Sequence, residues 1–331
     1  MIKRFLFCLV YPIYKLKDYP VLYRGKNFKL VNFGIFAAFD AMAISIIFFY
    51  YLFLKGYIPT LKILFLWLLS GVFIWIGAKL FFFLVWWEDF IQNPKGYIFQ
   101  TGFSNHGGII GGILLAFLLS FLTKINIFII FDGLCIGSFL GQFFGRLGCY
   151  NYGCCYGKPT DVQWSICYTN MDSKILRLYP NMKGVNIHPT QLYTAFINLL
   201  AFIGFIFFLN HIPFDGLISS IFLIFHGLSR VFLENFRFDI YKNNKRTKTT
   251  LKTAIIFILL GILLMIIEIK IFPDYFNSSS VIENSSLKTF TDLFLYYPVI
   301  ILFILIVGVI NFIGYGIHGK KLGVLPYISK A

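Results

Sequence analysis

Long apolar stretches separated by short polar segments dominate the chain. A mostly apolar stretch of about 18 residues or more is long enough to cross a membrane as a helix. This rule predicts spans at about 33–54, 62–87, 107–123, 127–147, 190–209, 214–236, 251–272 and 296–317. The third of these is short for a full crossing.

The polar segments between these spans divide the chain further. Residues 1–32 are basic and amphipathic and are expected to lie along the membrane surface, while 148–189 have too few apolar residues in a row to span. Residues 273–295 are expected to form a flexible loop. The predicted organisation is therefore a basic N-terminal segment, helices 1–4, a polar cap insertion, helices 5–6 and a C-terminal transmembrane region, at 1–32, 33–147, 148–189, 190–237 and 238–331.

Composition supports this fold class. The chain is 58% hydrophobic and 13% charged, whereas a soluble protein has about 25% charged residues. We therefore expect an all-α polytopic membrane protein, a bundle of about seven to eight transmembrane helices with a small extramembrane insertion. The net charge of +15 favours contact with anionic membrane lipids. Nucleic acid is not an expected partner, because the basic residues do not alternate with aromatic ones on a soluble surface.

Glycines in the fourth span recur at every fourth position, which predicts a smooth ridge where a neighbouring helix approaches closely. They are Gly133, Gly137, Gly141 and Gly145. A second face of the same span carries Asp132, Cys135, Gln142 and Arg146. This polar stripe is equally consistent with a cavity wall and with a satisfied hydrogen-bond network inside the membrane.

Arginines in two spans indicate an anion site. Arg146 would cost about 2.5–3.5 kcal/mol near the bilayer centre, and folding a membrane helix does not require it there. In the sixth span His226, Arg230, Glu234 and Arg237 are predicted to share one helix face, with Glu234 able to pair with either arginine. A phosphate accepts guanidinium hydrogen bonds bidentately, and phospholipids are the abundant phosphates of a bilayer. A structural ladder of ion pairs remains the alternative.

The remaining reactive residues are a histidine and six cysteines. His106 precedes Gly107 and Gly108 and is expected near a helix N-terminus, which favours a neutral imidazole able to accept a proton. Cys149, Cys154, Cys155 and Cys167 with His188 are open to interpretation as a metal site or a disulfide framework. Their spacing is not that of a zinc knuckle, so isolated buried thiols are favoured. We expect no metal ion and no organic cofactor.

Four motifs carry a resemblance to a known family. They are Ser104-Asn105-His106-Gly107-Gly108, Gly145-Arg146-Leu147-Gly148 continuing to Tyr156-Gly157, His188-Pro189-Thr190-Gln191-Leu192-Tyr193, and Arg230 to Arg237, with Asp132 between the first two. In order, spacing and membrane context, over roughly residues 30–240, the chain resembles the prolipoprotein diacylglyceryl transferases. The last ninety or so residues carry no recognisable match.

The resemblance implies an activity and a set of site residues. The family moves the diacylglyceryl group of phosphatidylglycerol onto a lipobox cysteine of an exported lipoprotein precursor, at the bacterial plasma (inner) membrane, and releases glycerol phosphate. It implies His106, Arg146 and Arg230 as catalytic residues, with His106 as the base. It further implies that phosphatidylglycerol is bound by Arg146, Arg230, Gly107, Gly108, Gly157, Gln191, Tyr193, Glu234 and Arg237.

The chain also departs from the family pattern. Phe33 stands where the family has Tyr, Cys149 where it has Asn, Cys154 where it has Glu, Thr194 where it has Glu, and His226 where it has Tyr. A divergent paralogue that binds anionic phospholipid, but uses another acceptor or is not catalytic, is therefore the alternative. The family places the N-terminus and the insertion outside the cytoplasm, whereas the distribution of Lys and Arg would place both inside.

Overall fold

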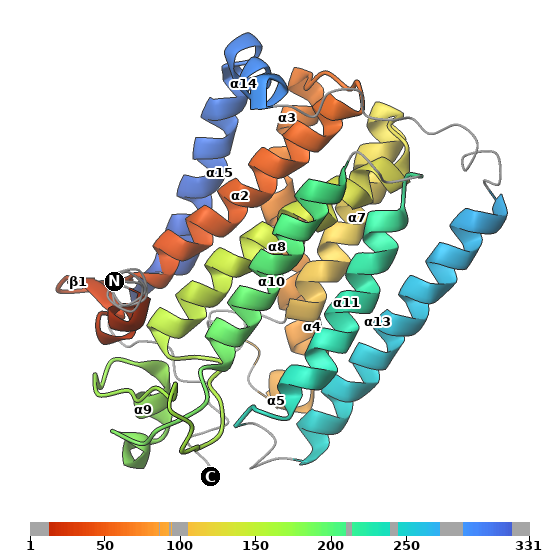
Figure 1. The fold of residues 1–331 in the computed structure, drawn as a ribbon. Helices are drawn as coiled ribbons and strands as arrows, with labels where there is room; N and C mark the ends of the chain where they lie inside the picture. The colour runs from red at the N-terminus through yellow and green to blue at the C-terminus, as the bar shows by residue number, and fades with distance from the viewer. Residues whose placement is uncertain are drawn as a thin grey trace, which may run out of the picture.

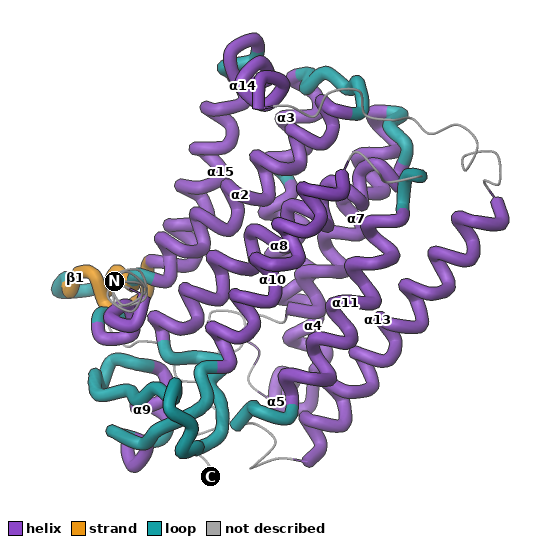
Figure 2. Tube along the Cα trace, in the orientation of Figure 1, coloured by secondary structure: helices purple, strands orange, loops and turns teal. Residues whose placement is uncertain are grey.

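The computed structural model describes residues 13–85, 87–92, 94, 105–209, 214–238, 244–271 and 287–319. In these residues long, roughly parallel helices form one bundle, with a loop-rich region at one end (Figures 1 and 2). The helices are α2 Phe33–Leu54, α3 Leu61–Leu68, α4 Ser70–Val85, α5 Trp87–Gln92, α7 Asn105–Thr123, α8 Ile127–Tyr152, α9 Lys174–Leu178, α10 Thr190–Phe208, α11 Leu217–Glu234, α13 Asn244–Ile271, α14 Leu287–Tyr296 and α15 Val299–Gly316, with 3-10 turns at Leu16–Asp18 and Pro180–Met182.

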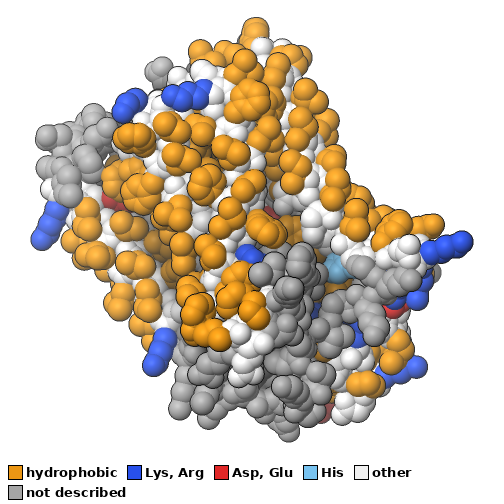
Figure 3. All heavy atoms as spheres, turned by 180° about the vertical axis from the view of Figure 1, so that it is seen from behind, with side chains coloured by type: hydrophobic (Ala, Val, Ile, Leu, Met, Phe, Trp, Pro, Cys, Tyr) orange, Lys and Arg blue, Asp and Glu red, His pale blue; other side chains and the backbone are white. Residues whose placement is uncertain are grey.

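The expected membrane architecture is confirmed. Within the described part of the chain, seven helices are long and apolar enough to cross a membrane, and Gly107–Thr123 is a shorter apolar helix. One face of the molecule is covered mostly by hydrophobic side chains, with Lys and Arg few and mainly near its margins (Figure 3). Exposed apolar surface of this extent is expected of helices that face lipid.

The bundle is organised around α8. Helix α2 packs along one side of α8 and α10 along another, while α15 packs on α2, α4 on α7 and α13 on α11. The core between α2 and α3 is aromatic: Phe48 stacks on Trp67 at 4.3 Å between ring centroids, and the Trp67 indole N–H donates to Ser45 at 2.8 Å. The central helices are thus held by close packing and a few buried hydrogen bonds.

The glycine ridge of α8 receives α2, as its four-residue spacing predicted. A side chain at Gly137 would lie 2.9 Å from the Ile44 carbonyl oxygen, and one at Gly133 would lie 3.1 Å from Phe48. At Gly141 and Gly145 the neighbouring group is the Asp40 carboxylate. Small residues on α8 therefore create the space that the Asp40 side chain of α2 occupies.

Several element ends differ from the expectation. The second span is interrupted at Leu69, where α3 gives way to α4, and residues expected in a loop contain α14. Helix α8 continues to Tyr152, because its glycines pack against α2 and the helix ends only at Gly153, which has φ 73°. The cap therefore begins five residues later than predicted. Helix α11 ends at Glu234, so Arg237 does not continue its helical face.

A three-stranded antiparallel sheet ties the start of the chain to its far end. Strands β1 Val21–Arg24 and β2 Phe28–Val31 form a hairpin, and β2 also pairs with β3 Ile317–Gly319. Leu30 lies opposite Ile317, and Lys29 lies opposite His318. The sequence predicted only a basic surface segment here, since backbone pairing across nearly three hundred residues leaves no local pattern.

The insertion forms a compact cap with a core of its own. Its buried residues are Tyr150, Ile166, Tyr168, Ile175, Leu176, Met182, Ile187 and Phe238. The Tyr168 hydroxyl donates to the Tyr150 carbonyl at 2.7 Å, which anchors the cap on the last turn of α8. The hairpin is joined to the cap by ion pairs of Arg24 and Lys29 with Asp172.

Candidate functional site

The last three turns of α8 carry Arg146 beside the half-buried carboxylate of Asp40. Asp40 lies against Gly141 and Gly145, and its charge interacts with that of Arg146. Arg146 itself is half-buried, and within the described residues no hydrogen bond or salt bridge engages its guanidinium group. A half-buried guanidinium with its donors available is suited to a negatively charged ligand.

The C-terminal end of α11 supplies the second arginine. The Arg230 guanidinium lies 3.2 Å from Glu234 Oε2, one helical turn further along, and Glu234 is only 2% exposed. Burying this carboxylate keeps the arginine paired and directed, because an isolated buried charge would be costly. The pairing predicted from the four-residue spacing is therefore present.

Arg237 reaches the same region from beyond the helix. After α11 ends, its backbone forms an antiparallel bridge with Gly157, and the neighbouring Phe236 carbonyl accepts the backbone N–H of Lys158 at 2.9 Å. The charge of Arg230 interacts with those of Arg146 and Arg237. The structure therefore gathers three guanidinium groups and two carboxylates, Asp40 and Glu234, where α8, α11 and the cap meet.

Gly157 lies where the cap loop passes closest to the chain. A side chain there would collide with the His188 carbonyl oxygen and would lie 2.9 Å from that of Phe236. Its own N–H donates to the His188 carbonyl at 3.2 Å. Only glycine fits, since any larger residue would push the cap loop away from the segment that carries Arg237.

The first turn of α10 holds the loop from the other side. Thr190 Oγ1 donates to the Cys155 carbonyl and Gln191 Nε2 donates to the Cys154 carbonyl, both at 2.7 Å. Gln191 is 1% exposed. The residues expected to bind substrate at this position therefore contact the cap backbone, and they fix the loop that follows Arg146.

Tyr193 and His188 form a short hydrogen-bonded chain with Trp164. The Trp164 indole N–H donates to the Tyr193 hydroxyl at 2.8 Å, and that hydroxyl lies 3.2 Å from His188 Nδ1. Burial, and then the charge of Lys158, lowers the pKa of His188. A neutral imidazole can accept a hydrogen bond from the Tyr193 hydroxyl at Nδ1, so the three side chains link the cap to α10.

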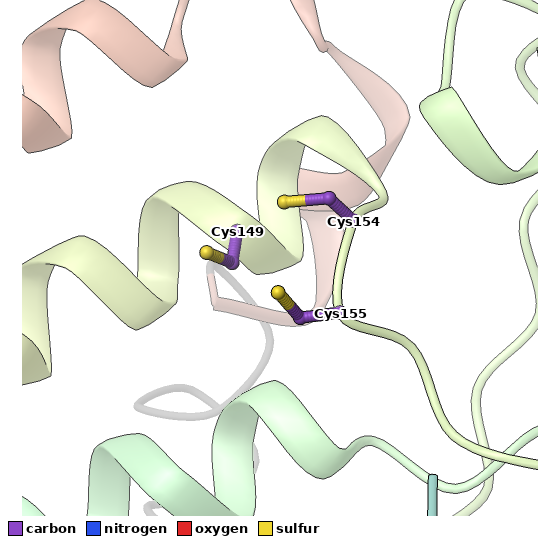
Figure 4. A group of neighbouring side chains, drawn as sticks. All are labelled: Cys149, Cys154 and Cys155. Atoms are coloured by element: carbon purple, nitrogen blue, oxygen red, sulfur yellow. The ribbon is translucent and has the colours of Figure 1, made fainter. Parts of the chain in front are cut away.

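Three thiols converge beside the arginines. Cys149 from the last turn of α8 and Cys154 and Cys155 from the following loop bring their sulfur atoms within 4.8 Å of one another (Figure 4). Hydrogen bonds with the thiols of Cys149 and Cys154, and then the positive charges of Arg237 and Arg146, lower the pKa of Cys155 well below its ordinary value. Hydrogen bonds with the other two thiols raise that of Cys154.

The histidine motif belongs to α7, which packs on α4. His106 is the second residue of α7, and its side chain is outside the described part of the structure. Gly107 packs against the backbone of α4 at Gly77 and Ala78, whereas a side chain at Gly108 would meet only Ile74, at 3.5 Å. The described contacts of these glycines are with α4, so they set the approach of α7 and α4.

The polar stripe of α8 divides into two regions. Asp132 is buried at the other end of the helix, where its carboxylate accepts the backbone N–H of Gly216 at 2.7 Å and that of Ser219 at 2.8 Å. It therefore caps the start of α11, and the hydrogen-bond alternative holds for this residue. The functional region is confined to the Arg146 end. Asp40 was not among the residues expected at this site, although an acidic residue within an apolar span is a signal of function.

Comparison with known proteins agrees with this geometry. The family model for prolipoprotein diacylglyceryl transferase matches residues 20–267. A phosphatidylglycerol–prolipoprotein diacylglyceryl transferase of Clostridium tetani is 28% identical over 196 residues, covering 58% of this chain and 75% of the relative. A second enzyme of that name from Clostridium perfringens is 30% identical, covering 60% and 73%, and one from Staphylococcus haemolyticus is 26% identical, covering 66% and 78%. With a match that spans both arginine-bearing helices and the cap between them, the chain belongs to the prolipoprotein diacylglyceryl transferase family.

Proposed function

We propose that this protein transfers the diacylglyceryl group of phosphatidylglycerol to a lipobox cysteine of an exported lipoprotein precursor. The observation that carries the proposal is that Arg146 of α8 and Arg230 of α11, near the C-terminal ends of two different membrane helices, lie close enough for their charges to interact. Fixed cations at this depth suit a lipid phosphate better than a soluble anion. The bacterial plasma membrane is the proposed location, since it contains both substrates.

The chemistry requires a phosphate leaving group and a thiolate. The sulfur of the acceptor attacks the carbon of the diacylglyceryl unit that bears the phosphate. The bond between that carbon and the phosphate oxygen breaks, which yields a thioether and glycerol phosphate. Arg146 and Arg230 stabilise the charge that gathers on the departing phosphate. Glu234 keeps Arg230 in place at 3.2 Å, so it acts on the substrate through the arginine.

The remaining proposed site residues shape and complete the site. Arg237 adds a third cation, and Gly157 allows the cap loop to lie against it. Gln191 and Tyr193 hold the cap on α10 next to the bound lipid. Gly107 lets the start of α7 lie against the backbone of α4, and Gly108 faces Ile74 of that helix. His106 directly precedes them, and we propose it as the base that takes the thiol proton.

A second function is favoured by one observation. Phe33, where the family has Tyr, packs on Tyr152 at 5.8 Å and Tyr315 at 6.2 Å between ring centroids and brings no hydroxyl to the site. Cys149 likewise stands where the family has Asn, so a second polar group of the family pattern is replaced. A protein that binds anionic phospholipid without transferring it would keep the arginines and lose these groups.

Transfer by the purified protein separates the two functions. Phosphatidylglycerol with a labelled glycerol headgroup is mixed with a lipobox peptide, and release of glycerol phosphate is measured beside the mass of the peptide. We expect the peptide to gain one diacylglyceryl group. An active transferase of the same family, assayed under the same conditions, is the positive control. Lipid binding without release of glycerol phosphate, while that control is active, would establish the binding function instead.

His106→Asn tests the proposed base in the same assay. Loss of a positioned base costs about 10²–10⁴-fold in rate, so transfer should fall by that factor while lipid binding is retained. Ser120→Ala is a control on the same helix, because Ser120 donates to the Ile125 carbonyl at the other end of α7. Undiminished transfer by His106→Asn would remove His106 from the mechanism.

A further inference from the structure

The three thiols beside the arginines form a site of their own. The sulfur atoms of Cys149, Cys154 and Cys155 all lie within 4.8 Å of one another. Within the described part of the chain no other histidine, cysteine or carboxylate atom belongs to this group. Spacing along the sequence argued for isolated thiols, but the fold brings all three to one point (Figure 4).

The backbone is shaped to bring them there. Gly153, in the left-handed region at φ 73°, ends α8, and the N–H groups of Gly153 and Cys154 both donate to the Cys149 carbonyl, at 3.0 and 3.1 Å. Cys155 is itself left-handed at φ 55°, a conformation that a residue with a side chain adopts at a cost. This second reversal turns the Cys155 thiol back toward Cys154, which adjacent residues in an extended chain do not allow.

The loop is also held rigidly from outside. Thr190 and Gln191 donate to the carbonyl groups of Cys155 and Cys154, so both cysteines are fixed to the first turn of α10. Cys149 is fixed by its helix. Ligands on rigid supports, with their own backbone groups satisfied, are typical of metal sites.

Thiolates are the preferred ligands of Zn²⁺, with zinc–sulfur distances of about 2.3 Å and tetrahedral angles. Three such bonds require sulfur atoms roughly 3.8 Å apart. The thiols here need to move together by at most about 1 Å, which side-chain rotation supplies. Three thiolates around Zn²⁺ carry one net negative charge, and the charges of Arg146 and Arg237 both act on Cys155. The surroundings therefore compensate the charge of a loaded site.

We propose that Cys149, Cys154 and Cys155 bind one Zn²⁺ ion as thiolates and leave its fourth coordination position open. A zinc site with three protein ligands and an open position is the arrangement of catalytic zinc, whereas structural zinc is closed by a fourth ligand. The open position lies in the group of residues already assigned to substrate.

If the proposed transfer function is correct, the acceptor cysteine is the ligand at the open position; this step rests on that function. The acceptor cysteine would bind zinc as a thiolate, losing its proton to solvent. Its sulfur then attacks the glycerol carbon of phosphatidylglycerol, the carbon–oxygen bond breaks with its electron pair on the phosphate, and the thioether leaves the metal. Zinc keeps its oxidation state throughout, so no oxidant or reductant is needed.

Metal content tests the site without reference to activity. The full-length protein is purified in detergent without chelators, and its zinc is measured by mass spectrometry of the metal. About one zinc per chain is expected for the wild type and for Cys167→Ser, a cap cysteine outside the group. Cys149→Ser, Cys154→Ser and Cys155→Ser should each lose most of it. Cd²⁺ titration of the metal-free protein should give thiolate charge-transfer absorption that saturates at one equivalent.

The outcomes separate the two parts of the proposal. Metal-free wild type without Cd²⁺ absorption, or a disulfide within the group in protein alkylated before purification, would overturn the site. Zinc binding with transfer unchanged after chelation would overturn the role at the open position and leave a structural site. If the wild type binds zinc but never transfers, the proposed function fails while the site stands.

Discussion

Two charged residues of α8 show how environment decides a residue's role. Asp132 and Arg146 lie on the same helix, and both are expensive to place in a membrane. The Asp132 carboxylate accepts hydrogen bonds from the backbone N–H and the hydroxyl of Ser219 and from the Gly216 N–H. These bonds stabilise the fold and leave little of the carboxylate for a ligand. Arg146 lies near the charge of Asp40 but, within the described residues, keeps its hydrogen-bond donors available. The second arrangement leaves interaction energy for a ligand.

Arg146→Lys is expected to weaken phosphatidylglycerol binding by about 1.5–3 kcal/mol, the value of a hydrogen bond to a charged group. The lysine keeps the charge that Asp40 requires but offers a point charge in place of the planar fork. Protein abundance should therefore hardly change. Lipid affinity in detergent is measured beside expression level, with Arg24→Lys in the exposed hairpin as the control. Wild-type affinity in Arg146→Lys would show that charge alone suffices there.

His188 makes the stability of the cap dependent on pH. Its folded pKa is lowered by burial and by Lys158, so the neutral form is favoured in the folded protein. Its contribution is therefore complete above the ordinary value of 6.5 and is lost as pH falls through the lowered folded value. His318, whose pKa is also lowered, acts in the same direction.

The melting temperature in detergent should thus fall between about pH 7.5 and about pH 5.5, and His188→Gln should reduce the size of that fall. His226→Gln, within α11, serves as the matched histidine control. An identical pH dependence in the wild type and His188→Gln would mean that His188 does not carry the effect.

At the scale of elements, the contact between α2 and α8 determines how the site is assembled. The ridge of small residues on α8 brings α2 close, and the same closeness places the half-buried Asp40 carboxylate next to Arg146. In lipid such contacts are stabilised by packing, because the surrounding tails are as apolar as the side chains they replace. Helix approach and site electrostatics are therefore set by the same glycines.

Gly137→Ala should lower the free energy of unfolding by about 1–3 kcal/mol, the usual cost of overpacking. The added methyl group would lie 2.9 Å from the Ile44 carbonyl oxygen and 3.1 Å from its Cα, both backbone atoms. Gly204→Ala in α10 is the matched control, since nothing lies within 4 Å of its added carbon and helix propensity favours alanine. Thermal denaturation in detergent compares the two. Equal melting temperatures would contradict the close contact of α2 with α8.

At the scale of the whole molecule, the polar elements gather at one end of the bundle. The Asn170 amide of the cap donates to the Asp18 carbonyl at 2.9 Å, and that of Asn151 in α8 donates to the Leu16 carbonyl at 2.6 Å. Strand β3 adds the end of α15 to the hairpin. The hairpin, the cap and the arginines therefore face the same compartment. For an exported acceptor, that compartment is outside the cytoplasm.

Lys183→Cys should react in intact cells with a thiol reagent that does not cross membranes. Lys183 is an exposed residue of the cap. Asp172, also in the cap, is less suitable for labelling because it forms ion pairs with Arg24 and Lys29. Labelling is corrected for the native cysteines with the wild type, and Lys62→Cys at the opposite end is the control that should react only after permeabilisation. The reverse result would place the cap in the cytoplasm, as the distribution of basic residues suggested.

The sequence alone determined the membrane class, most of the spans, the ridge on α8 and the pairing of Arg230 with Glu234. These features depend on the length of apolar stretches and on helical periodicity, which are local properties. Only the tertiary structure decided which residues meet across the chain. It paired β2 with β3, carried Arg237 beyond α11 onto Gly157, and through two left-handed residues gathered three thiols that spacing had kept apart. Such contacts depend on chain reversals and distant packing, which no repeating pattern in the sequence records.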